Sequence, residues 1–244
     1  MIDIHTHILP GVDDGARDLA ESLTMARQAV ADGLTHLFAT PHHRDYTSLS
    51  RLDVTQRVAQ LQVELDKAGI PLTLLPGHEV RLYDDMFDDW ANNLAGPLGE
   101  SRYVLAEPLF HHYDKRTDAM LFELFDRGYL PIMAHPERIR PIQDNPALIE
   151  PFLARGGLTQ ITATSLTGNG DWRGKQTAET MLRNGMVHLI ASDAHHSYHR
   201  PPTLAAARDA AALIVGQAQA AAMVSARPLA IVKNESVEVA PVFI

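Results

Sequence analysis

The chain has 244 residues, with 30 acidic and 21 basic side chains and a formal net charge of −9. This charge argues against a nucleic-acid-binding surface, which requires clustered Lys and Arg side chains. Cysteine is absent, which excludes disulfide bonds, Cys-ligated zinc and a thiol nucleophile. The 13 histidines instead favour metal coordination by imidazole and carboxylate groups.

The length fits one large α/β domain, and length alone also allows two. We expect a single domain over residues 1–244, with a core at about 1–225 and a tail without motifs at about 226–244. No apolar stretch approaches the ~20 residues that a membrane helix needs, so membrane insertion is not expected. Candidate ligands begin at residue 5, which argues against a cleaved signal peptide and predicts a cytoplasmic protein.

The first predicted element is a short strand at residues 2–4, which is followed directly by His5-Thr6-His7. Because side chains alternate along a strand, His5 and His7 would lie on the same face. Two imidazoles in this arrangement can bind one divalent ion such as Zn, Fe, Mn or Co.

A unit then repeats in architecture along the chain: an amphipathic segment, a glycine and an apolar run. Glycine just past a helix favours a left-handed C-cap, and the apolar run is typical of a strand that is buried on both faces. With the first element and one further run, the predicted strands are 2–4, 35–40, 72–75, 102–106, 130–134, 158–162 and 186–191. Seven strands alternating with helices predict an α/β fold with a parallel sheet, closed as a barrel.

Functional side chains of parallel α/β barrels gather at the carboxyl ends of the strands. Six of the seven predicted strands end at a residue that can bind a metal, whereas the strand at 158–162 does not. These residues are His5 and His7, His42, Glu79, Glu107, His135, and Asp193 with His195. The pattern predicts a metal centre at this end of the barrel.

Five segments resemble a known family. They are DIHTHILPGVDDGA (3–16), ATPHH (39–43), AHPER (134–138), ASDAH (191–195) and RPP (200–202). These motifs resemble the PHP (polymerase and histidinol phosphatase) superfamily, and within it the bacterial tyrosine-protein phosphatases of the CpsB/YwqE type. The resemblance runs from residue 2 to about 206.

The resemblance implies a distorted seven-stranded TIM-like barrel (PHP fold) with three divalent ions, with Mn favoured and Fe, Zn or Co as alternatives. One ion would lie with His5, His7, Glu79 and Asp193, a second with Glu79, Glu107 and His135, and a third with Asp14, His42 and His195. The phosphate-contacting arginines of the family correspond to Arg138 and Arg200. The implied activity is hydrolysis of phosphotyrosine by metal-activated hydroxide, on a tyrosine kinase of capsule or exopolysaccharide synthesis.

The alternatives are a histidinol-phosphate or other small-molecule phosphatase of the same fold, a metal-dependent amidohydrolase, and a barrel kept only as a binding module. No lysine stands at a strand end, which disfavours an amidohydrolase with a carboxylated lysine, and the complete ligand set disfavours a binding module. Outside the ligand set, we expect Arg81 to be a surface charge, Asp13 a turn residue and His188 a hydrogen-bonded packing residue.

Overall fold

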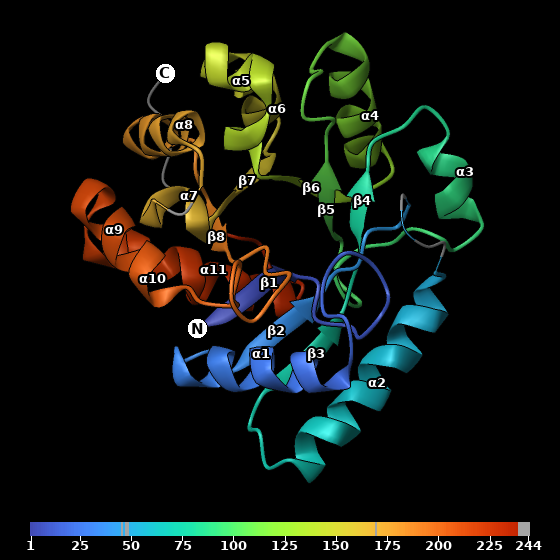
Figure 1. The fold of residues 1–244 in the computed structure, drawn as a ribbon. Helices are drawn as coiled ribbons and strands as arrows, with labels where there is room; N and C mark the ends of the chain where they lie inside the picture. Colours follow the sequence, from blue (N-terminus) through green and yellow to red (C-terminus); the bar gives the residue numbers. More distant parts are fainter. Residues whose placement is uncertain (45, 47–48, 169, 239–244) are drawn as a thin grey trace.

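The computed structural model describes residues 1–44, 46, 49–168 and 170–238, and strands alternate with helices through most of this part of the chain (Figure 1). The strands are β1 (Ile2–Thr6), β2 (His36–Ala39), β3 (Thr73–Pro76), β4 (Glu79–Arg81), β5 (Tyr103–Glu107), β6 (Leu130–Ala134), β7 (Leu158–Thr162) and β8 (Leu189–Ala191). The α-helices are α1 (Leu19–Ala31), α2 (Arg51–Lys67), α3 (Met86–Ala91), α4 (Lys115–Asp126), α5 (Arg140–Asp144), α6 (Glu150–Ala154), α7 (Ala163–Thr167), α8 (Trp172–Arg183), α9 (Ala205–Val215), α10 (Gln217–Val224) and α11 (Ala226–Val232). Two 3-10 helices are η1 (Pro136–Arg138) and η2 (Pro146–Ile149).

All seven predicted strands are present, and the predicted glycines end the helices that precede them. Each glycine has a left-handed φ between 65° and 95°, at Gly33, Gly69, Gly128, Gly156 and Gly185. Carboxylates cap the starts of two of the longer helices. Asp18 accepts from the Glu21 N–H before α1, and Asp114 forms a capping box with Thr117 before α4.

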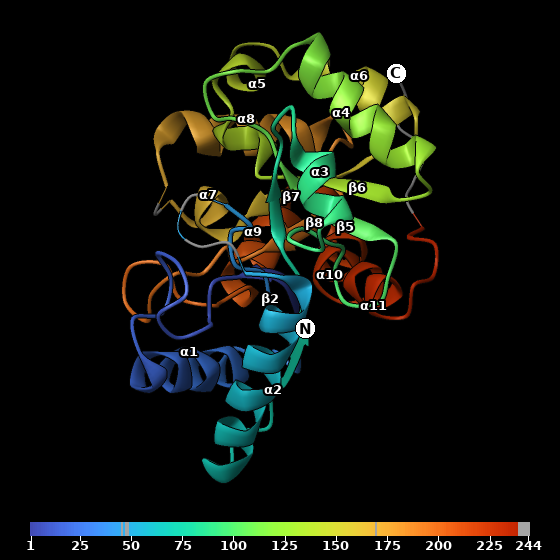
Figure 2. The same ribbon diagram turned by 90° about the vertical axis from the view of Figure 1, so that its right-hand side faces the viewer.

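The described strands form two parallel sheets, β1-β2-β3 and β4-β5-β6-β7-β8, with most helices on their outer side (Figure 1, Figure 2). This arrangement confirms the mixed α/β class with parallel strands. The prediction of a closed, seven-stranded barrel is not confirmed, because an eighth strand, β4, is present and no continuous ladder closes the described strands into one sheet.

The short connection between β3 and β4 explains the division. Parallel neighbours need a crossover of a dozen or more residues, whereas only Gly77 and His78 separate these two strands. β4 therefore cannot pair with β3 as a parallel neighbour, and the chain bends into the second sheet. A Cβ atom at Gly77 would lie 2.8 Å from the Leu98 side chain, so the bend has room only for glycine.

Two edges of the sheets meet beyond the ends of the regular strands. At the β2/β4 edge, Glu79 N donates to Pro41 O (3.1 Å) and His43 N donates to Glu79 O (3.2 Å). At the β1/β8 edge, Asp193 N donates to His5 O (2.9 Å) and His7 N donates to the Ala194 carbonyl (2.8 Å). Both edges therefore meet at predicted metal ligands.

The space between the strands is filled by a buried apolar cluster that includes Ile4, Phe38 and Ile132. Ile231 of α11 belongs to the same cluster, so the first part of the predicted tail packs into the interior. Of the tail at 226–244, residues 239–244 lie outside the described residues. Among the helices that the structure describes, none is both long enough and apolar enough to cross a membrane.

Candidate metal centre

The structure brings all nine predicted ligands together at the carboxyl ends of the strands. Eight of them are at least 90% buried, and Asp14 has the most exposed side chain of the nine, at 39%. The buried ligands are His5, His7, His42, Glu79, Glu107, His135, Asp193 and His195. Burial of so many charged and polar groups at one place requires that they compensate one another or share cations.

Glu79 lies at the centre of the cluster. Its Oε1 is 3.3 Å from His5 Nε2 and 2.9 Å from His135 Nε2. Its Oε2 is 3.5 Å from His7 Nε2 and 2.9 Å from His42 Nδ1. Each oxygen thus faces two imidazoles, which is an arrangement suited to a carboxylate that bridges two cations.

Asp193 connects this cluster to the arginines. Its Oδ1 lies 3.4 to 3.6 Å from nitrogens of His5, His7 and His195. Its Oδ2 accepts a hydrogen bond from Arg138 Nη1 at 2.7 Å and a second one from Arg200 Nη2. Both predicted phosphate-contacting arginines therefore lie directly beside the candidate ligands.

Asp14 lies with two imidazoles at the more open side, where its Oδ1 is 3.4 Å from His42 Nε2 and 3.3 Å from His195 Nε2. Ligand atoms gather within 4.8 Å in four overlapping groups: His7 with Asp14, His42 and His195; His5 with His7 and Asp193; His5 with Glu79 and His135; and His42 with Glu79 and Glu107. These groups share members, so they resemble the partition that the sequence predicts without reproducing it.

The hydrogen bonds around His5 and His7 test whether the cluster suits cations. His5 Nδ1 lies 2.9 Å from Gln160 Oε1, and His7 Nδ1 lies 2.7 Å from Asp13 Oδ2. Both oxygens only accept, so each Nδ1 carries a proton, and in the neutral form of each ring Nε2 offers its lone pair to the cluster. The two Nε2 atoms lie 3.3 Å apart. Facing lone pairs repel each other, and a cation between them would satisfy both.

Two carboxylates give a second sign of a cation site. The Oε2 atoms of Glu79 and Glu107 are buried and accept no well-directed hydrogen bond from the residues that the structure describes. His42 Nδ1 and Arg81 Nε each approach one of them to 2.9 Å. Unsatisfied buried oxygens are costly in a protein interior. A donor set of imidazole and carboxylate suits divalent Mn, Fe, Zn or Co.

The pKa shifts within the cluster also point to cations. Burial lowers the pKa of His5, but Glu79 and Asp193 outweigh it and raise that pKa to about 9. Burial opposes a similar rise at His42, where the nearby carboxylates of Asp14 and Glu79 raise the pKa to about 11. Burial and the nearby Glu79 raise the pKa of Glu107 to about 8. The cluster therefore attracts positive charge.

Three neighbours of the ligands were not predicted as site residues. The interpretation of Asp13 as a turn residue is incomplete, because besides accepting from Gly15 N (3.0 Å) it holds the His7 ring. The strand without a ligand, β7, contributes Gln160, which holds the His5 ring. Alternation along 158–162 places Gln160 on the inward face with buried Leu158, which was the available signal.

The third of these neighbours is Arg81, and its interpretation as a surface charge is wrong. Its side chain is only 14% exposed, and its Nε lies 2.9 Å from Glu107 Oε2. Residues 79 and 81 lie on one face of β4, so this arginine enters the same cavity as Glu79.

A cavity of about 110 Å³ lies over the cluster and is lined by candidate ligands and by Arg81, Arg138 and Arg200. The described lining residues that are neither ionisable ligands nor arginines are Tyr46 and Phe110. Tyr46 stacks on His42 at 5.2 Å and donates to Asp14 Oδ2 at 3.0 Å. Phe110 stacks on His135 at 5.3 Å, with the Arg138 guanidinium 4.9 Å from its ring centre.

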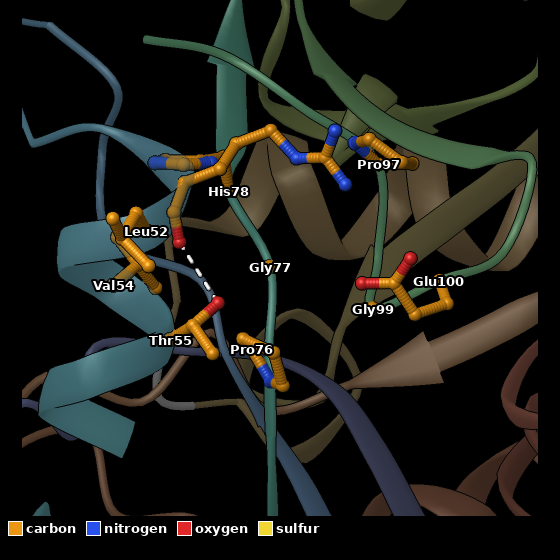
Figure 3. Close-up of a pocket in the computed structure, with 10 residues that line it drawn as sticks. Leu52, Val54, Thr55, Pro76, Gly77, His78, Pro97, Gly99 and Glu100 are labelled. Carbon is orange, nitrogen blue, oxygen red and sulfur yellow. Dashed lines mark hydrogen bonds between the residues drawn. The ribbon is translucent and has the colours of Figure 1, made fainter. Parts of the chain in front are cut away.

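A separate pocket of about 140 Å³ lies between the start of α2 and the bend at Gly77 (Figure 3). It is lined by Leu52, Val54 and Thr55 on one side and by Pro97, Gly99 and Glu100 on another. Thr55 Oγ1 donates to the Arg51 carbonyl within the helix. None of the predicted site residues lines this pocket, so the chemistry belongs to the cavity over Glu79.

Comparison with known proteins gives the family. Residues 1–233 match the family described as capsular polysaccharide synthesis, CpsB/CapC. The tyrosine-protein phosphatase YwqE of Bacillus subtilis (strain 168) is 39% identical over 197 residues, which are 80% of this chain and 78% of that protein. The tyrosine-protein phosphatase CpsB of Streptococcus pneumoniae is 25% identical over 241 residues, covering 96% and 99% of the two chains.

A solved structure agrees with these sequence matches. It comes from a study of YwqE from Bacillus subtilis and CpsB from Streptococcus pneumoniae, which are described there as metal-dependent tyrosine phosphatases. It superposes with a TM-score of 0.92 at 34% identity and covers 99% of this chain and 98% of the other. This chain therefore belongs to the CpsB/CapC family of capsular polysaccharide synthesis.

Proposed function

We propose that this chain is a metal-dependent protein-tyrosine phosphatase that acts on a tyrosine kinase of capsule or exopolysaccharide synthesis. The proposal rests on the two carboxylate oxygens of Asp193. One oxygen faces imidazoles, and the other accepts hydrogen bonds from Arg138 and Arg200. A phosphoryl group at this boundary meets cations on one side and two guanidinium groups on the other. The names of the relatives point to the same activity.

Three divalent ions, with manganese favoured, would be held by the nine candidate ligands. In the partition that we propose, Glu79 with His5, His7 and Asp193 would hold one ion, Glu79 with Glu107 and His135 a second, and Asp14 with His42 and His195 the third. Bound divalent ions neutralise phosphoryl charge and lower the pKa of water from 15.7 to about 7.

Arg138 and Arg200 bind and orient the phosphoryl group. Their planar forks suit two phosphoryl oxygens at once, and both already donate to a carboxylate oxygen with similar acceptor geometry. Tyr46 and Phe110 offer rings against which the tyrosine side chain of the substrate packs. Because Tyr46 also donates to Asp14, it holds one candidate ligand in place.

We also propose that residues 1–244 form one domain with a distorted barrel. Two features support this. Hydrogen bonds link the two sheets at the β1/β8 and β2/β4 edges, and one large apolar cluster includes both Met25 of α1 and Val224 of α10.

The function is tested by turnover of p-nitrophenyl phosphate, phosphotyrosine peptide, phosphoserine peptide and histidinol phosphate after chelation and re-addition of Mn²⁺. We expect chelation to abolish activity, Mn²⁺ to restore it, and phosphotyrosine to be preferred. Iodoacetamide should have no effect because the chain has no cysteine. Full activity in chelator would reject the metal requirement, and preference for histidinol phosphate would reject the substrate.

A further inference from the structure

A groove of about 390 Å³ opens between the loop that precedes α3 and the start of α4. We call it the α3/α4 groove. It is lined by Arg44, Leu82, Tyr83, Asp84, Asp85, Leu109, His112, Asp114, Arg116, Thr117 and Met120. Its volume lies within the range of about 300–1,000 Å³ that is typical of ligand sites, whereas the catalytic cavity, at about 110 Å³, has room for little more than a phosphoryl group.

The groove lies close to the catalytic cavity, because two pairs of consecutive residues are divided between them. Arg81 lines the cavity and Leu82 the groove, and Phe110 lines the cavity and Leu109 the groove. The Leu82 N–H donates to the carbonyl of the candidate ligand Glu107 at 2.9 Å, which fixes the shared wall. A substrate chain with its phosphotyrosine in the cavity can therefore reach the groove within a few residues, since an extended chain advances about 3.3–3.6 Å per residue.

Charged side chains around the groove already have partners within the protein. Arg44 lies 3.2 Å from Asp85, and Arg116 donates to Asp84. Asp114 accepts from the Arg116 N–H at 2.9 Å as the cap of α4, so this helix start is not open to an anion. A charged occupant would have to displace one of these pairs.

Apolar side chains supply the remaining surface. Leu109 is 43% exposed, and Leu82 forms a buried part of the wall. Met120 of α4 is half-buried and lines the same groove. Methionine and leucine are suited to contact a varied aliphatic or aromatic partner.

We propose that the α3/α4 groove binds an apolar side chain that flanks the phosphotyrosine in the substrate protein. This inference rests on the proposed phosphatase function, because it names a second contact of the same substrate. The groove selects among phosphotyrosine sites, while Arg138, Arg200 and the metal ligands act on every aryl phosphate alike.

The test compares phosphotyrosine peptides in which leucine replaces serine at one flanking position at a time. Wild-type protein should hydrolyse one such peptide with about tenfold higher kcat/KM than the all-serine peptide, which is a modest share of what burial of a leucine can contribute. Leu109→Asn should remove most of this preference, and Met120→Gln should weaken it independently. Leu213→Asn, on a 90% exposed leucine of α9, is the matched control and should keep it.

Turnover of p-nitrophenyl phosphate separates the possible failures. It should be unchanged in all three variants, because this small substrate does not reach the groove. Equal kcat/KM for all peptides would reject the proposal that the groove binds a flanking side chain. A leucine preference that persists in both groove variants would reject it as well. A parallel loss on p-nitrophenyl phosphate would also overturn it, by showing that Leu109 acts through Phe110 on catalysis. No turnover of any aryl phosphate by the metal-loaded protein would reject the proposed function and the groove with it.

Discussion

Arg138 and Arg200 both donate hydrogen bonds to Asp193, and this contact allows their role to be tested by single substitutions. Because Arg138 and Arg200 donate to a candidate ligand without being ligands themselves, their removal should slow turnover and leave the metals bound. We expect Arg138→Ala and Arg200→Ala to lose about 10- to 100-fold in kcat/KM, equivalent to about 1.5–3 kcal/mol of transition-state stabilisation. Lysine should restore only part of the rate, since it lacks the planar fork.

Steady-state kinetics with p-nitrophenyl phosphate, combined with elemental analysis of bound metal, measures both effects. Arg127→Ala is a suitable control, because Arg127 pairs with Glu123 on the exposed face of α4. Metal-replete variants at wild-type rate would show that the arginines do not contact substrate. Loss of metal with loss of rate would show that they act by holding Asp193.

For single residues, the position just after a predicted strand is enough to predict a site residue. The sequence does not predict site residues whose role depends on a partner elsewhere in the fold. His135 and Asp193 could be predicted because each directly follows an apolar run. Gln160 and Arg81 were missed. Alternation places Gln160 on the inward face, but a polar residue inside a strand is identified as a site residue only once its neighbour across the fold is known. The contact of Asp13 with His7 was missed for the same reason, because an aspartate in a turn has the same sequence pattern whether or not it also contacts a histidine.

Among the elements, strand β7 carries no candidate ligand, but its Gln160 orients the candidate ligand His5. Gln160 accepts from His5 Nδ1, so Gln160→Leu would leave a buried N–H without a partner and release the His5 ring. Loss of such an orienting contact typically costs 10- to 100-fold in metal affinity, and we expect about this effect. Competition with a chelating dye gives the affinity without relying on turnover.

Thr162 provides a control on the same face of β7. Its hydroxyl is buried and has no hydrogen-bond partner among the described residues, so Thr162→Val keeps the volume and breaks no bond. We expect this variant to bind metal like the wild type. Equal affinity in Gln160→Leu would show that His5 is held by the backbone and by its other neighbours.

The elements themselves could be predicted where a glycine and an apolar run coincide, as at Gly128 before β6. β4 was missed because it has three residues, begins and ends with charged side chains, and follows β3 after only two residues. The division into two sheets depends on that short connection, which has no periodic pattern to reveal it.

For the whole molecule, His188 links stability to pH. Burial and the nearby Arg227 lower its pKa from 6.5 to about 4, and its Nδ1 accepts from the Thr159 N–H at 3.1 Å. Between these two values the unfolded chain binds a proton that the folded chain does not. The contribution of His188 to the free energy of unfolding is therefore fully present above pH 6.5. It falls as the pH is lowered towards 4, by up to about 1.4 kcal/mol per pH unit.

His188→Asn keeps an acceptor near the position of Nδ1 and removes the titration. We expect its free energy of unfolding, from urea denaturation at a series of pH values between 6.5 and 5, to fall less steeply with decreasing pH than that of the wild type. The difference in slope should approach the value for one bound proton. The same metal content in both proteins keeps other titrations equal. Identical slopes would show that His188 is protonated in the folded state.

The two edges described above have a consequence for how metal would leave the protein. Each edge is joined by a few backbone hydrogen bonds beyond the regular strands, and these bonds flank His5, Asp193 and Glu79. A local opening event at one edge would separate ligands that belong to different sheets while the helices stay packed. The dissociation rate of the ions would then follow the frequency of edge opening, and inactivation in mild denaturant would precede global unfolding.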